Sequence, residues 1–233
     1  MPIKCAGAPQ KAMYLSTDHW RRTEVQDKID TQFFNSGAVL FDVPDYVPAL
    51  MEYVKRYDIT LNFGHTLSAI DGPAKRASFI RAMPDGTKKT VTTDFNMIHV
   101  VPPQKAPDFI RVSPLADAAG WVDVDQGTMR HKTFRNIYAL GDAGSTPNAK
   151  TAAAARKQAP VVAHNVLVGL GKLKDEAKYD GYRSCPLTVE RGKIVLTDQW
   201  HKALQSRMVP QGAHPAATLL ERHVEGPGVA RRP

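Results

Sequence analysis

Residues 136–158 read NIYALGDAGSTPNAKTAAAARKQ, and this stretch decides the fold. An apolar run at 137–140 stops at Gly141 and Asp142, and a loop then leads into an alanine-rich segment. That segment predicts a helix, because alanine has the highest helix propensity. A buried strand, a glycine beside a carboxylate and the start of a helix are typical, in this order, of a flavin or nucleotide site in a doubly wound sheet.

The residue types suit such a site. Gly141 has no Cβ, so the backbone can pass close to a ligand, and Asp142 can accept hydrogen bonds from sugar or ribityl hydroxyls. Lys150 and Thr151 stand at the predicted helix start, where unpaired N–H groups and the helix dipole attract negative charge. The alternative is an ordinary strand–helix turn whose aspartate only caps the helix. The motif alone leaves both interpretations open.

The rest of the sequence predicts a mixed α/β fold. Residues 32–41 are a strand candidate, Pro44 and Asp45 open a helix with apolar residues at helical spacing, and 59–63 is a second strand candidate. This order forms a parallel βαβ unit. Three short strand candidates then predict a small antiparallel meander: residues 66–70, 77–82 and 87–92.

Composition limits the functional classes. The chain has 233 residues with a formal net charge of +8, and this length can bury a sizeable core. No apolar stretch reaches the ~20 residues of a membrane-spanning helix. The first ten residues carry no targeting pattern, so we expect a soluble protein made in the cytosol. Basic residues are scattered without an RNA motif or a helix-turn-helix pattern, and nucleic acid is therefore not an expected partner.

Several blocks resemble sulfide:quinone oxidoreductases. The IYALGD of residues 137–142 is similar to the second flavin fingerprint of flavoproteins with two dinucleotide-binding domains. The group that includes the mitochondrial enzyme has, in the same order, blocks similar to IKCAGAPQKAMYLS, MIHVVPP, SPLADAAGWVDVD, LGDAGSTPNAKTAAAA and KYDGYRSCPL. This resemblance implies an α/β fold of the Rossmann-like, FAD/NAD(P)-binding kind: a partial two-dinucleotide-binding-domain flavoprotein with a small antiparallel meander.

The resemblance also implies a reaction. Sulfide would be oxidised to a persulfide or other sulfane sulfur, with two electrons passing through FAD to a membrane quinone. Cys5 and Cys185 match the cysteines that form the family's redox pair at the flavin. Asp142 would hold the ribityl chain, whereas Lys150 and Thr151 would lie near the pyrimidine end of the flavin. On composition alone, two cysteines in such a chain would be inert thiols.

The resemblance is to the C-terminal portion of the enzyme. No G-x-G-x-x-G, the family's fingerprint for the ADP part of FAD, follows a strand near the start. We therefore expect the upstream FAD-binding half to be missing and this chain to be inactive alone. Residues 1–105 would be the remainder of the second dinucleotide-type domain, and 106–197 the returning part of the FAD domain with the redox cysteine segment.

Residues 198–233 depart from the family, which continues into an amphipathic segment that meets the membrane. Their composition predicts an atypical, disordered tail. Its histidines His201, His214 and His223 have a spacing that fits no recognised metal site, and no metal is expected. For the full enzyme the resemblance implies a cytoplasmic location, peripheral at the inner face of the membrane.

Two other interpretations stay open. The chain could come from another FAD-dependent oxidoreductase of the same superfamily, such as a type II NADH dehydrogenase, although the cysteine pair argues against this. It could also be a catalytically dead fragment that acts, if at all, as a binding or structural element.

Overall fold

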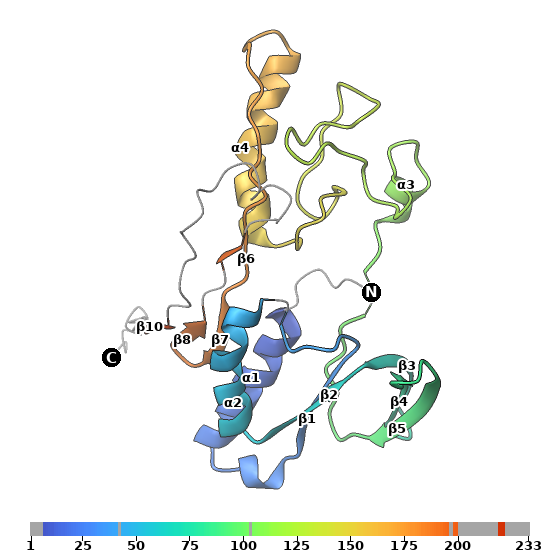
Figure 1. The fold of residues 1–233 in the computed structure, drawn as a ribbon, viewed down its shortest axis with the longest axis vertical. Helices are drawn as coiled ribbons and strands as arrows, with labels where there is room; N and C mark the ends of the chain where they lie inside the picture. The colour runs from blue at the N-terminus through green and yellow to red at the C-terminus, as the bar shows by residue number, and fades with distance from the viewer. Residues whose placement is uncertain (1–6, 42, 103, 196–197, 200–218, 222–233) are drawn as a thin grey trace, which may run out of the picture.

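The structure is a computed structural model that describes residues 7–41, 43–102, 104–195, 198–199 and 219–221 (Figure 1). The helices are α1 (Gly7–Arg22), η1 (Gln26–Lys28), η2 (Pro44–Tyr46), α2 (Val47–Arg56), α3 (Asp108–Arg111) and α4 (Ala152–Gly169), with η denoting 3-10 turns. The strands are β1 (Thr31–Asn35), β2 (Ile59–Phe63), β3 (His65–Asp71), β4 (Arg76–Ala82), β5 (Lys88–Asp94), β6 (Arg183–Ser184), β7 (Leu187–Glu190), β8 (Lys193–Val195), β9 (Asp198–Gln199) and β10 (Leu219–Glu221).

The predicted βαβ unit is confirmed. Strands β1 and β2 pair in parallel, and η2 with α2 connects them. The first strand is shorter than predicted because the side chain of Asn35 ends it: its Oδ1 accepts the N–H of Gly37 at 3.2 Å and its Nδ2 donates to the carbonyl of Val39 at 2.9 Å. Such side-chain turns compete with strand pairing.

The predicted meander is also confirmed. Strands β3, β4 and β5 form an antiparallel sheet in sequence order. The turn between the last two strands is fixed by Asp85, whose Oδ1 accepts hydrogen bonds from the N–H and hydroxyl of Thr87 at 2.9 and 2.6 Å. Phe79 of β4 stacks on Phe34 of β1 with ring centroids 4.2 Å apart. This contact joins the meander to the parallel pair.

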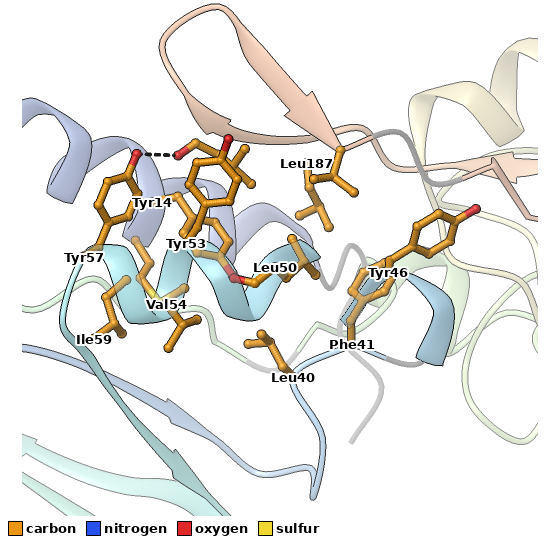
Figure 2. Close-up of a cluster of buried hydrophobic side chains, with 13 residues drawn as sticks. Tyr14, Leu40, Phe41, Tyr46, Leu50, Tyr53, Val54, Tyr57, Ile59 and Leu187 are labelled. Atoms are coloured by element: carbon orange, nitrogen blue, oxygen red, sulfur yellow. Dashed lines mark hydrogen bonds between the residues drawn. The ribbon is translucent and has the colours of Figure 1, made fainter. Parts of the chain in front are cut away.

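A first hydrophobic core joins segments that are far apart in the sequence (Figure 2). It lies between α1, α2, β2 and the β7–β8 hairpin, with Tyr14, Leu50 and Leu187 fully buried. The phenol of Tyr57 donates to the carbonyl of Val189 at 3.1 Å across this core. Residues near the start and near residue 190 therefore fold as one body.

A second core lies along α4, and the segment after this helix returns beside it (Figure 1). Its buried residues are Val122, Val124, Met129, Val161 and Tyr179. Asn165 of α4 is buried and ties the returning segment down. Its Nδ2 donates to the carbonyls of Thr128 and Ala177, both at 2.9 Å. None of the helices in the described part of the chain is long and apolar enough to cross a membrane.

The expectation of a buried strand at 137–140 is wrong. These residues are half-buried and belong to no described sheet, although a single antiparallel bridge joins Tyr138 to Arg130. Backbone bonds link only one edge of the segment, for example from the N–H of Ala139 to the carbonyl of Met129 at 3.1 Å. No described strand runs beside the other edge. A central strand needs partners on both sides to be buried and to form a ladder.

Two short strands of the 198–233 segment are described. Strand β9 pairs with β6, and β10 pairs with β8, both antiparallel. The histidines of this segment lie outside the described residues.

Candidate functional site

The turn at Gly141 joins the extended segment to the loop before α4. Its φ of +62° lies in the left-handed region, which glycine adopts without the steric cost that a side chain brings. The N–H of Gly141 donates to Oε1 of Gln158 on α4 at 2.7 Å. The turn is therefore anchored to the helix behind it.

Asp142 follows directly and is exposed. It lies at the end of the extended segment, but that end is not the edge of a described sheet. Placed there, the carboxylate can accept hydrogen bonds from hydroxyl groups of a ligand that approaches the turn.

Lys150 and Thr151 lie immediately before α4. The ammonium group of Lys150 donates to the carbonyl of Gly144 and lies 4.4 Å from the centroid of the Trp121 ring. A cation over an aromatic face is held by the quadrupole of the ring. Thr151 is the N-cap residue: its Oγ1 accepts the N–H of Ala154 at 3.2 Å. The structure thus gives both residues clear roles in holding the loop and starting the helix.

Cys185 is half-buried between β6 and β7. Gly7, the first residue of α1, lies against it: a Cβ added to Gly7 would be 2.6 Å from Sγ of Cys185 and 2.8 Å from Cδ2 of Leu187. Only glycine permits this approach without a shift of its neighbours. Cys5 lies outside the described residues, two positions before Gly7.

Three polar residues near the loop were missed by the reasoning from sequence. Gln158, Asn148 and Tyr179 are 1%, 5% and 3% exposed. Nδ2 of Asn148 donates to the phenol of Tyr179 at 3.0 Å. For Gln158 the available signal was the spacing on α4: the buried positions Ala154, Gln158, Val161 and Asn165 follow helical periodicity, and two of them are polar. Buried polar groups are almost always hydrogen-bonded, and so they point to specific partners.

Elsewhere, an open hollow of about 640 Å³ lies beside the hairpin that precedes Phe134. Its wall contains four basic side chains: Arg130, Lys132, Arg135 and Lys178. Two of them are paired, Arg130 with Glu176 at 2.8 Å and Lys132 with Asp123 at 2.6 Å. Within the described residues, no three His, Cys, Asp or Glu side chains gather as metal ligands would.

The comparisons with known proteins agree with the resemblance of the sequence blocks. No family model matches the chain. The mitochondrial sulfide:quinone oxidoreductase of Mus musculus is 37% identical over 197 residues, which is 84% of this chain and 43% of that protein. The Dictyostelium discoideum protein of the same name is 41% identical over 197 residues, again 84% of this chain and 42% of the relative.

The chain is homologous to part of a sulfide:quinone oxidoreductase. The resemblance predicted from the sequence blocks is thereby confirmed. The chain spans less than half the length of the curated sulfide:quinone oxidoreductases that it matches.

A solved structure supports the fold. The sulfide:quinone oxidoreductase of Aquifex aeolicus superposes with a TM-score of 0.66, at 15% identity, over 83% of this chain and 48% of that one. At this identity the likeness concerns the fold alone. It confirms the predicted partial flavoprotein fold with its small antiparallel sheet.

Proposed function

We propose that this chain is the C-terminal half of an FAD-dependent sulfide:quinone oxidoreductase. In this proposal the complete protein oxidises sulfide to a persulfide or other sulfane sulfur and passes the electrons through FAD to a quinone. The observation that carries it is the 37–41% identity to enzymes of that name over 84% of the chain. The partial coverage of those relatives supports the assignment to one half of the enzyme, and the missing half would supply the rest of the FAD site.

The loop from Gly141 to Thr151 offers groups that fit one side of a flavin. The exposed Asp142 is an acceptor suited to the ribityl hydroxyls, as the family resemblance implies. The helix behind the loop presents its N-terminus, where N–H groups and the helix dipole favour negative charge. Lys150 adds a cation that Trp121 and the carbonyl of Gly144 hold near this end. When bound, FAD would accept the electron pair that sulfide gives up.

The cysteine pair is the second part of the proposal. Cys5 lies outside the described residues and precedes Gly7 by two positions in the sequence. Gly7 in turn packs against Sγ of Cys185. This proximity supports a shared redox site in which the two cysteines cycle through disulfide and persulfide states.

The division at residues 105 and 197 is part of the same proposal. The β7–β8 hairpin packs on α1 and α2 in the first core, so the cysteine segment would connect the two dinucleotide-type regions. The relatives are named as mitochondrial. Peripheral contact with a membrane, where the quinone would be reached, belongs to the proposal for the complete enzyme.

The test is co-expression. The 233-residue chain should bind FAD weakly and show no sulfide-dependent quinone reduction by itself, because the glycine turn that grips the pyrophosphate is absent from its sequence. With an upstream FAD-binding half from a homologous enzyme, a flavin absorbance spectrum and turnover should both appear. An active flavoprotein formed by this chain alone would contradict the half-enzyme assignment.

Two variants sharpen this test. In the co-expressed protein, Cys185→Ser should abolish sulfide oxidation while the flavin spectrum persists, whereas Asp142→Ala should weaken flavin retention. Thr66→Ser, on the remote meander strand β3, is a matched control for a small polar substitution. Full sulfide oxidation by Cys185→Ser would remove the redox role of the cysteine pair.

A further inference from the structure

Gln158 and Tyr179 hold the 141–151 loop from behind. Both side chains are buried, at 1% and 3% exposure. Oε1 of Gln158 accepts the N–H of Gly141 at 2.7 Å, and the backbone of Gly141 has a positive φ that few other residues would adopt. The acceptor on α4 therefore fixes the first residue of the loop, next to Asp142.

Tyr179 acts on the other end of the same loop. Its phenol oxygen accepts a hydrogen bond from Nδ2 of Asn148 at 3.0 Å and donates to the backbone carbonyl of Tyr182. Burial raises the pKa of the Tyr179 phenol to about 12. The phenol therefore keeps the proton that it donates throughout the neutral pH range.

The carbonyl that Tyr179 holds belongs to the cysteine segment. Tyr182 precedes β6 and stands three residues before Cys185. A second contact from α4 reaches the same residue, since the ammonium group of Lys157 lies 5.7 Å from the centroid of the Tyr182 ring. One phenol thus contacts both the loop, through Asn148, and the cysteine segment, through Tyr182.

We propose that Gln158 and Tyr179 are positioning residues that keep the 141–151 loop and the Cys185 segment in one fixed arrangement. The inference rests on the proposed function for what these two segments bind and react with. A redox thiol and the group that takes its electrons must be held at a set separation, because small displacements of reacting groups slow reactions strongly. The hydrogen bond from Gly141 to Gln158 on α4, and those that join the buried phenol of Tyr179 to Asn148 and Tyr182, provide this rigidity.

The experiment needs no flavin. In a Cys5→Ser background of the chain, Tyr179→Phe removes only the phenol oxygen, and Gln158→Met removes the acceptor for Gly141 at similar volume. Two rates are measured under native conditions: reaction of Cys185 with Ellman's reagent, and hydrogen exchange of the Gly141 amide by NMR. Val161→Ala is the matched control, because Val161 is buried on the same helix and in the same core and its side chain makes no hydrogen bond.

Tyr179→Phe should accelerate labelling of Cys185 several-fold. Gln158→Met should accelerate exchange of the Gly141 amide about tenfold, the change expected for loss of a hydrogen bond of ordinary strength. Val161→Ala should change both rates less than twofold at a similar loss of global stability. If the two test variants show the same rates as Val161→Ala, the positioning role is overturned. The change would then reflect a general loss of stability of the fold.

The outcome is separable from that of the proposed function. If both rates rise as expected but the co-expressed protein binds no flavin, the fixed arrangement stands and the flavoprotein assignment falls. If the co-expressed protein binds flavin and oxidises sulfide but neither rate changes, the positioning role falls and the assignment stands.

Discussion

Replacing Gly7 with alanine tests the close approach of α1 to the cysteine segment. The new Cβ would lie 2.6 Å from Sγ of Cys185 and 2.8 Å from Cδ2 of Leu187, both shorter than carbon and sulfur atoms allow. Both atoms end side chains and can rotate, but Leu187 is fully buried in the first core, where a new rotamer meets other packed side chains. The site must therefore shift, and overpacking of this kind costs about 1–3 kcal/mol.

Part of this cost is offset. Alanine is favoured over glycine in a helix by up to about 1 kcal/mol, although less at the first residue of α1. We therefore expect Gly7→Ala to lower the free energy of unfolding by about 1–2 kcal/mol. Because Sγ of Cys185 is displaced, its reaction with Ellman's reagent should also change, measured in a Cys5→Ser background where Cys185 is the remaining cysteine.

The matched control is Gly72→Ala, since nothing lies within 4 Å of a Cβ added to Gly72. Urea unfolding followed by circular dichroism gives the free energy for each variant. If Gly7→Ala and Gly72→Ala unfold alike and Cys185 reacts at the unchanged rate, the close approach of Gly7 to Cys185 is refuted.

Three further predictions concern stability. Leu50→Ala should lower the unfolding free energy by about 2–5 kcal/mol, because Leu50 is fully buried in the first core; Met51→Ala, one position on and 40% exposed, should cost less than about 1 kcal/mol in the same urea titration. Asp125→Ala should lower the unfolding free energy by about 1 kcal/mol at pH 7. The carboxylate of Asp125 accepts hydrogen bonds, the strongest from the backbone N–H of Thr128, and these hold the pKa of Asp125 below its usual value. This contribution is present above the pKa of the unfolded chain and is lost as the pH falls through the lower folded pKa, so wild type and variant should converge in urea titrations toward pH 2. Tyr179→Phe should make the unfolding free energy fall less steeply at alkaline pH. Burial raises the pKa of Tyr179 from 10.0 to about 12, so its contribution to stability is full below pH ~10 and is lost as the pH rises through ~12. A variant whose unfolding free energy falls as steeply as that of the wild type would contradict this.

Elements with strong local signals were predictable from the sequence. The helix start at Pro44, the helical spacing of the apolar residues after it and the three short strand candidates are local features. They predicted the βαβ unit and the meander correctly. Helix α1 was missed although its buried positions are helically spaced. Three of these positions are the polar residues Gln10, Thr17 and Asp18, and polar residues on the buried face hide the apolar stripe by which amphipathic helices are recognised.

Long-range contacts were not predictable. The 137–140 segment has the composition of a central strand, but composition does not say which strands lie beside it. The candidate site shows the same limit. Gly141, Asp142, Lys150 and Thr151 came from one continuous motif, whereas Gln158 and Tyr179 act through partners on other segments. A single sequence does not show which distant polar groups will meet in a core.

The first core has a consequence for biosynthesis. Asp18 of α1 accepts a hydrogen bond from the backbone of Arg191, 173 residues later in the chain, and Leu187 and Val189 complete the packing around Tyr14. Helix α1 can pack on α2 soon after synthesis, but it leaves the ribosome long before its partners in the β7–β8 hairpin exist. At about 5–20 residues per second of translation, the part of α1 that this hairpin covers stays open for on the order of ten seconds or more. This region is where we expect chaperones to bind the nascent chain, and where a high contact order slows folding after release.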